Sequence, residues 1–179
     1  MILISVKPCC GGQDESAVAR EALFTVLRER FSLPEIEIKK TAEGKPYFDD
    51  GRYPAFSISH TEGAVCVAIS DTADSVGVDI ERYSERLKDP RLTDRFFPRL
   101  ELSKNEITDI EILTVEDVRV EENTDIVFTL GEAIIKCDGR GFVAAALARA
   151  LSEGMKKASF KLSVDEESFA LSVALKEKE

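Results

Sequence analysis

FSISHTEGAVCVAIS, residues 56–70, consists of two apolar runs separated by the short polar segment HTEG, which is the pattern of a β-hairpin. The stretch FKLSVDEESFALSVAL, residues 160–175, has the same plan: a phenylalanine, alternating residues up to a serine, a polar turn and an apolar strand. Repetition of this kind favours two similar units packed together. Chance is the alternative, because hairpins are common.

Each predicted hairpin follows a predicted helix. Residues 14–31 carry apolar side chains near helical spacing, with Asp14 as the cap. A second helical pattern begins at Asn123 or Thr124 and ends at Gly139 or Gly141. Short strands are predicted at 2–6 and 75–83, and short helices at 89–97, 102–107 and 143–154, whereas 109–122 fits a strand or a helix equally.

These patterns predict an α+β fold that forms a single domain over residues 1–179. We expect two similar helix-plus-antiparallel-sheet halves, residues 1–100 and 101–179, packed as a pseudo-dimer within a monomeric chain. The seam between two such halves is the natural place for a binding cleft.

The composition predicts a cytoplasmic globular protein that does not enter membranes. Hydrophobic residues make up 44% of the chain and charged residues 32%. No apolar run approaches the roughly 20 residues that span a bilayer, and the start MILISVKPCCGG is too short and too polar for a signal peptide. The four cysteines, Cys9, Cys10, Cys66 and Cys137, lack metal-ligand spacing and are expected to be reduced thiols.

The net charge of −10 argues against general nucleic-acid binding, which needs a basic face to displace counterions from phosphates. Within this acidic chain, residues 82–99 carry six bases against three acids. Such a segment either receives an acidic partner or is an ordinary solvated face.

The strand SVGVDIERY, residues 75–83, carries Asp79 and Glu81 two residues apart and therefore on the same face. Two like charges held this close repel unless a cation lies between them, and Mg²⁺ is the first candidate. The alternative is a strand end with two solvated acids.

Glu132 and Lys136 are four residues apart on the second predicted helix and lie on the same side of it. Taken alone they form an exposed ion pair; together with Asp79 and Glu81, Glu132 completes a three-carboxylate site for Mg²⁺ on a substrate phosphate. Phosphate-binding candidates are Lys136, Lys45 in the turn EGKPYF, and His60 beside Ser59 at the hairpin turn.

Five ordered motifs resemble those of the 4′-phosphopantetheinyl transferases, in particular the longer, pseudo-dimeric kind. They extend from Gly44 to Gly141: GKPYF (44–48), FSISHTEG (56–63), VGVDIER (76–82), RFF (95–97) and LGEAIIKCDGRG (130–141). The combination of GVDIE with EAxxKxxGxG downstream is specific, whereas GKP alone is weak.

The resemblance implies Mg²⁺-dependent transfer of 4′-phosphopantetheine from coenzyme A to a serine of an acyl or peptidyl carrier protein, with adenosine 3′,5′-bisphosphate released. It implies that Asp79, Glu81 and Glu132 bind the metal and that Glu132 and Lys136 are catalytic. It further implies that Arg20, Lys45, Ser59, His60 and Lys136 bind the substrate. The alternatives are a coenzyme A-binding or regulatory relative with little transferase activity, and a Mg²⁺-dependent phosphohydrolase.

The chain departs from the family at WxxKEA, where it has Phe128 and Gly131. Gly131 removes a cation and puts glycine inside a helix, at a cost of about 1 kcal/mol relative to alanine. We therefore expect Gly131→Lys to stabilise the helix and to return a cation to the substrate phosphates.

Overall fold

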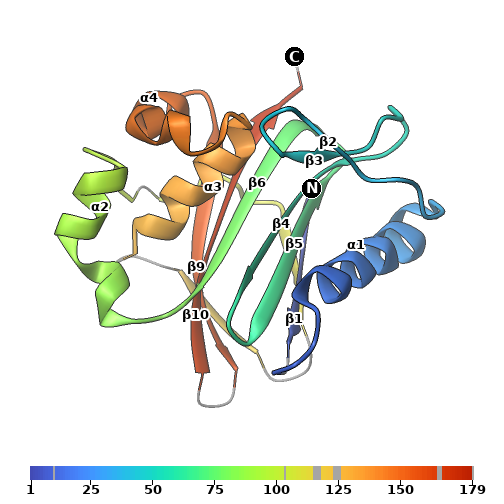
Figure 1. Ribbon diagram of the computed structural model, residues 1–179, viewed down its shortest axis with the longest axis horizontal. Coiled ribbons are helices and arrows are strands. Elements are labelled where there is room, and N and C mark those ends of the chain that lie inside the picture. The colour runs from blue at the N-terminus through green and yellow to red at the C-terminus, as the bar shows by residue number, and fades with distance from the viewer. Residues whose placement is uncertain (10, 103, 115–117, 123–125, 165–166, 179) are drawn as a thin grey trace.

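The computed structural model describes residues 1–9, 11–102, 104–114, 118–122, 126–164 and 167–178. Within these residues the protein has the predicted α+β class, with two four-stranded sheets, one two-stranded sheet and four α-helices. Figure 1 shows α1 on the outer side of one large sheet, and α2, α3 and α4 on the outer side of the other.

The first sheet has the strand order β4 (Ala55–Thr61), β5 (Ala64–Ser70), β1 (Ile2–Pro8), β7 (Ile110–Leu113). β1 runs antiparallel to β5 and parallel to β7. Helix α1 (Glu15–Phe31) begins where expected, because the Asp14 carboxylate accepts hydrogen bonds from the amides of Ser16 and Ala17. Leu23 and Leu27 bury the helix against Phe56 and neighbouring strand residues.

The second sheet has the order β6 (Ala73–Arg82), β10 (Glu167–Glu177), β9 (Lys156–Val164), β8 (Arg119–Glu122). Helix α3 (Phe128–Asp138) lies directly on β6. A Cβ atom at Gly77 would come within 2.0 Å of the Ala133 carbonyl oxygen, so only glycine permits this approach.

The main core lies between the two sheets. Alternate residues of β1, such as Ile2 and Ile4, share one cluster with Val78 and Ile80 of β6 and Leu171 of β10. Because side chains alternate along a strand, this alternation turns Gly77, Asp79 and Glu81 to the opposite face of β6, on which α3 lies.

Strand, helix and hairpin follow one another twice along the chain. In the first instance β1 and α1 precede the β4–β5 hairpin, and β5 pairs antiparallel with β1; in the second, β6 and α3 precede the β9–β10 hairpin, and β10 pairs antiparallel with β6. The smaller elements are β2 (Lys39–Lys40), β3 (Pro46–Tyr47), the 3-10 helices η1 (Glu85–Lys88) and η2 (Gly141–Leu147), α2 (Pro90–Phe96) and α4 (Ala148–Ser152).

Several predicted boundaries were wrong. The helix expected over 102–107 is absent from its described residues, because the Asn105 side chain accepts a hydrogen bond from the Ser159 amide and the Glu106 amide donates to the Lys157 carbonyl. The segment 109–122, which the sequence left open between strand and helix, has the strands β7 (Ile110–Leu113) and β8 in its described residues. The helix expected over 143–154 is divided between η2 and α4.

Helix α3 begins at Phe128 and is capped by Gly139, one of the two glycines predicted to end it, which has a left-handed conformation with φ of 88°. The expected caps Asn123 and Thr124 lie outside the described residues. Cys9, Cys66 and Cys137 are buried and form no disulfide in the part of the chain that the structure describes, which does not include Cys10. None of the described helices has the length and apolar character needed to cross a membrane.

Candidate active site between β4, β6 and α3

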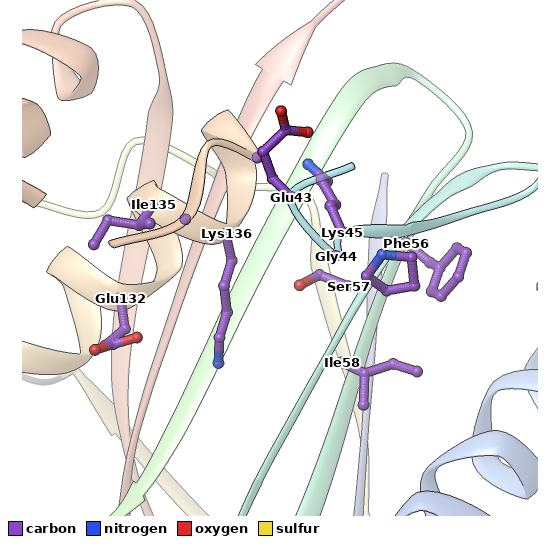
Figure 2. A pocket seen from close by; sticks show the side chains of 12 residues that line it. Glu43, Gly44, Lys45, Phe56, Ser57, Ile58, Glu132, Ile135 and Lys136 are labelled. Carbon is purple, nitrogen blue, oxygen red and sulfur yellow. The ribbon is translucent and has the colours of Figure 1, made fainter. Parts of the chain in front are cut away.

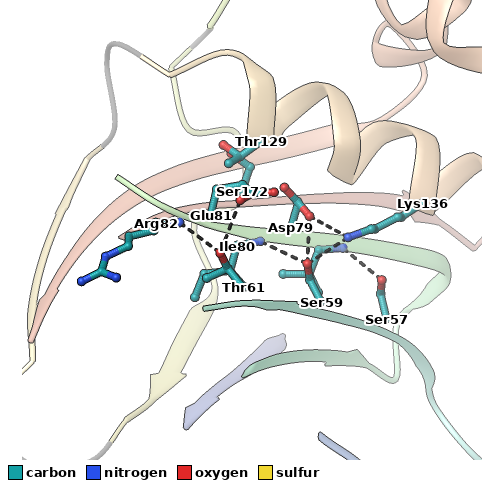
Figure 3. Close-up of polar contacts among 11 residues, drawn as sticks. Ser57, Ser59, Thr61, Asp79, Ile80, Glu81, Arg82, Thr129, Lys136 and Ser172 are labelled. Atoms are coloured by element: carbon teal, nitrogen blue, oxygen red, sulfur yellow. Dashed lines mark hydrogen bonds and ion pairs between the residues drawn. The ribbon is translucent and has the colours of Figure 1, made fainter. Parts of the chain in front are cut away.

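Asp79 is the most deeply buried charged residue of the candidate site, with 3% of its surface exposed. Its Oδ1 atom accepts hydrogen bonds from Ser59 Oγ at 2.8 Å and from Lys136 Nζ at 2.6 Å (Figure 3). Its Oδ2 atom is buried and has no hydrogen-bond partner among the described residues. A buried carboxylate oxygen without a partner is costly, and a bound cation would remove that cost.

The close approach of α3 to β6 at Gly77 brings Lys136 to Asp79. Lys136 Nζ also donates to Ser59 Oγ at 2.9 Å, so one ammonium group joins α3 to both β4 and β6. The structure therefore brings Ser59, Asp79 and Lys136 together, and the contacts of the Ser59 hydroxyl are with these side chains rather than with the substrate cavity for which the sequence proposed it.

Burial raises the pKa of all three carboxylates of the predicted metal site, and the Asp79 charge raises the pKa of the other two further. Burial raises the pKa of Asp79, although the Lys136 ammonium and the Ser59 hydroxyl favour its charged form. Burial and then the Asp79 charge raise the pKa of Glu81. Burial, the Asp79 charge and, more weakly, the Glu81 charge raise the pKa of Glu132 to about 7. Repulsion of this kind is relieved when a cation binds between the groups.

Glu132, Lys136 and Lys45 line one cavity of about 250 Å³. Figure 2 shows Glu132 and Lys136 entering it from α3, with the 43–46 turn and β4 on the opposite side. Ser57 and Ile58 form part of the wall, and Gly139 and Gly141 lie at the end of α3. Two carboxylates, Glu43 and Glu132, and two cations thus share one concave space, a combination that suits an anionic substrate with a reacting hydroxyl.

Lys45 is not held out from its turn as expected. Its ammonium turns inward and donates to Ser75 Oγ and, at 2.7 Å, to the Cys137 carbonyl near the end of α3. Burial lowers the pKa of Lys45. Lys45 therefore joins the 43–46 turn to α3 and β6, and its charge lies at the negative end of the helix dipole.

His60 and Arg20 are not brought to this cavity. His60 lies within β4 rather than at the hairpin turn, and its Nδ1 atom is 2.7 Å from Glu15 of α1. It lines a different cavity, of about 560 Å³, together with Arg82. The Arg20 guanidinium lies 5.2 Å from the centre of the Phe24 ring on α1.

Gly131 faces the apolar side of α3 rather than the cavity. A Cβ atom here would lie 2.4 Å from the ring of the fully buried Phe97. The expectation that Gly131→Lys stabilises the helix was therefore wrong, because this glycine makes room for an aromatic ring. Phe97 in turn makes an edge-on contact with Phe128, at a centroid distance of 5.5 Å.

Asp79, Glu81 and Glu132 offer the oxygen donors that a divalent cation takes, but their side chains do not converge on one point. Among the residues that the structure describes, no three His, Cys, Asp or Glu side chains lie close enough together to hold a metal ion. Asp79, with its unpartnered Oδ2, and the half-buried Glu81 and Glu132 could supply carboxylate oxygens, which are the ligands that Mg²⁺ prefers.

Sequence reasoning missed polar residues that support the site. Ser75 Oγ donates to the Cys137 carbonyl at 2.5 Å. Thr129 of α3 and Ser172 of β10 are fully buried, with their hydroxyls 2.8 Å apart. These residues could have been found as serines and threonines in otherwise apolar strands and helices, because a buried hydroxyl needs a hydrogen-bond partner.

No protein-family model matches this chain, and a search of the curated proteins also finds no match.

Proposed function

We propose that this protein transfers 4′-phosphopantetheine from coenzyme A to a serine hydroxyl of an acyl or peptidyl carrier protein in a Mg²⁺-dependent reaction. The observation that carries the proposal is the meeting of Glu132, Lys136 and Lys45 in one cavity beside the buried Asp79. A pyrophosphate ester with an incoming hydroxyl requires this combination of carboxylates and cations.

The strand–helix–hairpin order that occurs twice supports the pseudo-dimeric fold of this family. In this proposal β1, α1, β4 and β5 correspond to β6, α3, β9 and β10, and the site lies where the two units meet. With this correspondence the second half of the pseudo-dimer would begin at β6, before the boundary near residue 100 that the sequence suggested. Because one chain supplies both halves, we propose a monomer, acting in the cytoplasm.

Asp79, Glu81 and Glu132 would hold the metal, which would neutralise charge on the pyrophosphate of coenzyme A. Lys136 lies beside Asp79 and would contact the phosphate that is transferred, as a fixed positive charge. Lys45 would bind a phosphate of the substrate at the other wall of the cavity, after its ammonium leaves Ser75 and Cys137.

Glu132 is the candidate general base. Without a bound metal its pKa is about 7; Mg²⁺ would lower this pKa and leave the carboxylate unprotonated at the working pH, where it can accept a proton. The serine oxygen would form a bond to the phosphorus that bears pantetheine, and the serine proton would pass to Glu132. The bond from that phosphorus to the bridging oxygen would break, and adenosine 3′,5′-bisphosphate would leave.

The test is incubation with coenzyme A, Mg²⁺ and an unmodified carrier protein, followed by intact mass measurement of the carrier. We expect a phosphopantetheine adduct that disappears when EDTA is added or when the carrier serine is replaced by alanine. Asp79→Asn should abolish the adduct, whereas Asp74→Asn, at an exposed position of the same strand, should not.

Two results would contradict the proposal. Cleavage of coenzyme A without an adduct on any of a broad panel of carriers would identify a phosphohydrolase. Binding of coenzyme A with neither cleavage nor transfer would identify a binding or regulatory relative.

A further inference from the structure

Side-chain hydroxyls join the edges of the two large sheets at β4 and β6. Ser57, Ser59 and Thr61, here called the hydroxyl row, occupy alternate positions of β4 and therefore share one face. The row accepts hydrogen bonds from alternate amides of β6, those of Val78, Ile80 and Arg82, at 3.1, 3.3 and 3.4 Å respectively (Figure 3).

Two members of the hydroxyl row also donate to a carboxylate. Ser59 Oγ donates to Asp79 at 2.8 Å, and Thr61 Oγ1 donates to Glu81 at 3.4 Å. In both cases one hydroxyl joins an acidic residue of β6 to the amide of the residue that follows it. Ser57 has the same amide contact, but the residue preceding Val78 is Gly77, which has no side chain to accept a hydrogen bond.

The Ser59 hydroxyl has no capacity left for a substrate phosphate. It has one proton, donated to Asp79, and two lone pairs, used by Lys136 Nζ and the Ile80 amide. Only 4% of the residue is exposed. Its contacts therefore act on Asp79 and not on a ligand.

We infer that Ser59 and Thr61 are positioning residues that fix how Asp79 and Glu81 face a divalent cation. Ser59 and Lys136 hold Oδ1 of Asp79 and thereby orient the buried, unpartnered Oδ2. Partners behind a metal ligand fix its orientation, and their loss commonly weakens metal binding by about 10-fold to 100-fold. This inference rests on the cation site of the proposed function.

The test measures the affinity for Mg²⁺ by titration calorimetry, in parallel with the free energy of unfolding. Ser59→Ala should weaken Mg²⁺ binding about 10-fold, and Thr61→Val by a smaller factor because its contact is longer. Thr61→Ser keeps the hydroxyl and should restore affinity. Ser57→Ala is the matched control: it removes the same kind of amide contact and should lower stability but leave Mg²⁺ affinity within about 2-fold of the parent.

Equal Mg²⁺ affinities for Ser57→Ala and Ser59→Ala, or a failure of Thr61→Ser to bind better than Thr61→Val, would overturn the inference. If Ser59→Ala does not fold, the two Thr61 variants decide alone. A parent protein that binds Mg²⁺ with this pattern but modifies no carrier would support the inference and defeat the proposed function. If the parent modifies carriers but the variants do not differ in Mg²⁺ affinity as predicted, the proposed function would stand and the inference would fail. If the parent does not bind Mg²⁺, both the inference and the proposed function would fail.

Discussion

At the scale of single residues, Glu132 carries the clearest dependence on pH. Its folded-state pKa of about 7 lies above the ordinary value of 4.5, so the folded protein binds more protons than the unfolded chain between these values. Stability attributable to this group is therefore fully present below pH 4.5 and is lost as the pH rises through 7. Ionised Glu132 destabilises the folded protein because the carboxylate is buried and lies near the Asp79 charge.

We predict that Glu132→Gln has a higher melting temperature than the parent protein at pH 8 without divalent cations, and nearly the same one at pH 4.5. Glutamine removes the charge but keeps the size of the side chain. Mg²⁺ should raise the melting temperature of the parent more at pH 8 than at pH 5, because the metal competes with protons for the carboxylates. Glu153→Gln, at an exposed position, is the control. An equal difference between variant and parent at both pH values would contradict the pKa assignment.

Gly131 shows how packing overrides helix propensity at a single position. Gly131→Lys gains about 1 kcal/mol of propensity, but its Cβ atom would enter the Phe97 ring. Overpacking of a core commonly costs about 1–3 kcal/mol, so we predict net destabilisation in urea unfolding. Combining Gly131→Ala with Phe97→Leu should be less destabilising than the sum of the single changes, because the smaller side chain makes room. Strict additivity would show that the two residues do not compete for this space.

At the scale of elements, the placement of α3 on β6 depends on Gly77. Gly77→Ala puts a methyl group 2.0 Å from the Ala133 carbonyl and 2.3 Å from the Cys137 amide. Backbone atoms cannot rotate away, so the helix must lift from the strand that carries Asp79. We predict a loss of about 3 kcal/mol or more in urea unfolding, with weaker Mg²⁺ binding.

Gly51→Ala is the matched control for Gly77, since nothing lies within 4 Å of its Cβ position and its φ is not positive. Its stability should stay within about 0.5 kcal/mol of the parent protein. A Gly77→Ala variant as stable as Gly51→Ala would mean that the helix does not approach the strand this closely.

The sequence predicted those elements whose causes are local. Helix α1 was predicted from the Asp14 cap and the apolar stripe that follows it. The hairpin of residues 56–70 was predicted from its two apolar runs and the polar turn between them. The segment around Asn105 is determined by hydrogen bonds to Ser159, 54 residues away in the chain, which no local pattern contains. The motifs assigned Asp79 and Lys136 to one site but did not predict their direct contact, and the inward turn of Lys45 depends on the end of α3.

At the scale of the whole molecule, the two sheets meet through groups that also make up the site. The hydroxyl row of β4 satisfies amides on the edge of β6, and Lys136 connects α3 to both strands. Separation of the sheets would therefore expose Asp79 and remove its partners in one step. Binding of a cation at Asp79 should for the same reason stabilise the folded state as a unit, by mass action.

The charge distribution of the molecule gives the last prediction. The chain has a net charge of −10, so under the proposed function an acidic carrier would be repelled except where bases gather, as they do around α2. Arg95 is exposed there, whereas Arg28, which is also exposed, lies on α1 at the opposite side of the molecule (Figure 1). Arg95→Glu and Arg28→Glu change the net charge equally. Only Arg95→Glu should raise the KM for an acidic carrier, by about 10-fold at low salt and less at high salt, with the KM for coenzyme A unchanged. Equal effects of the two variants would show that repulsion by the whole molecule, and not docking at α2, governs carrier capture.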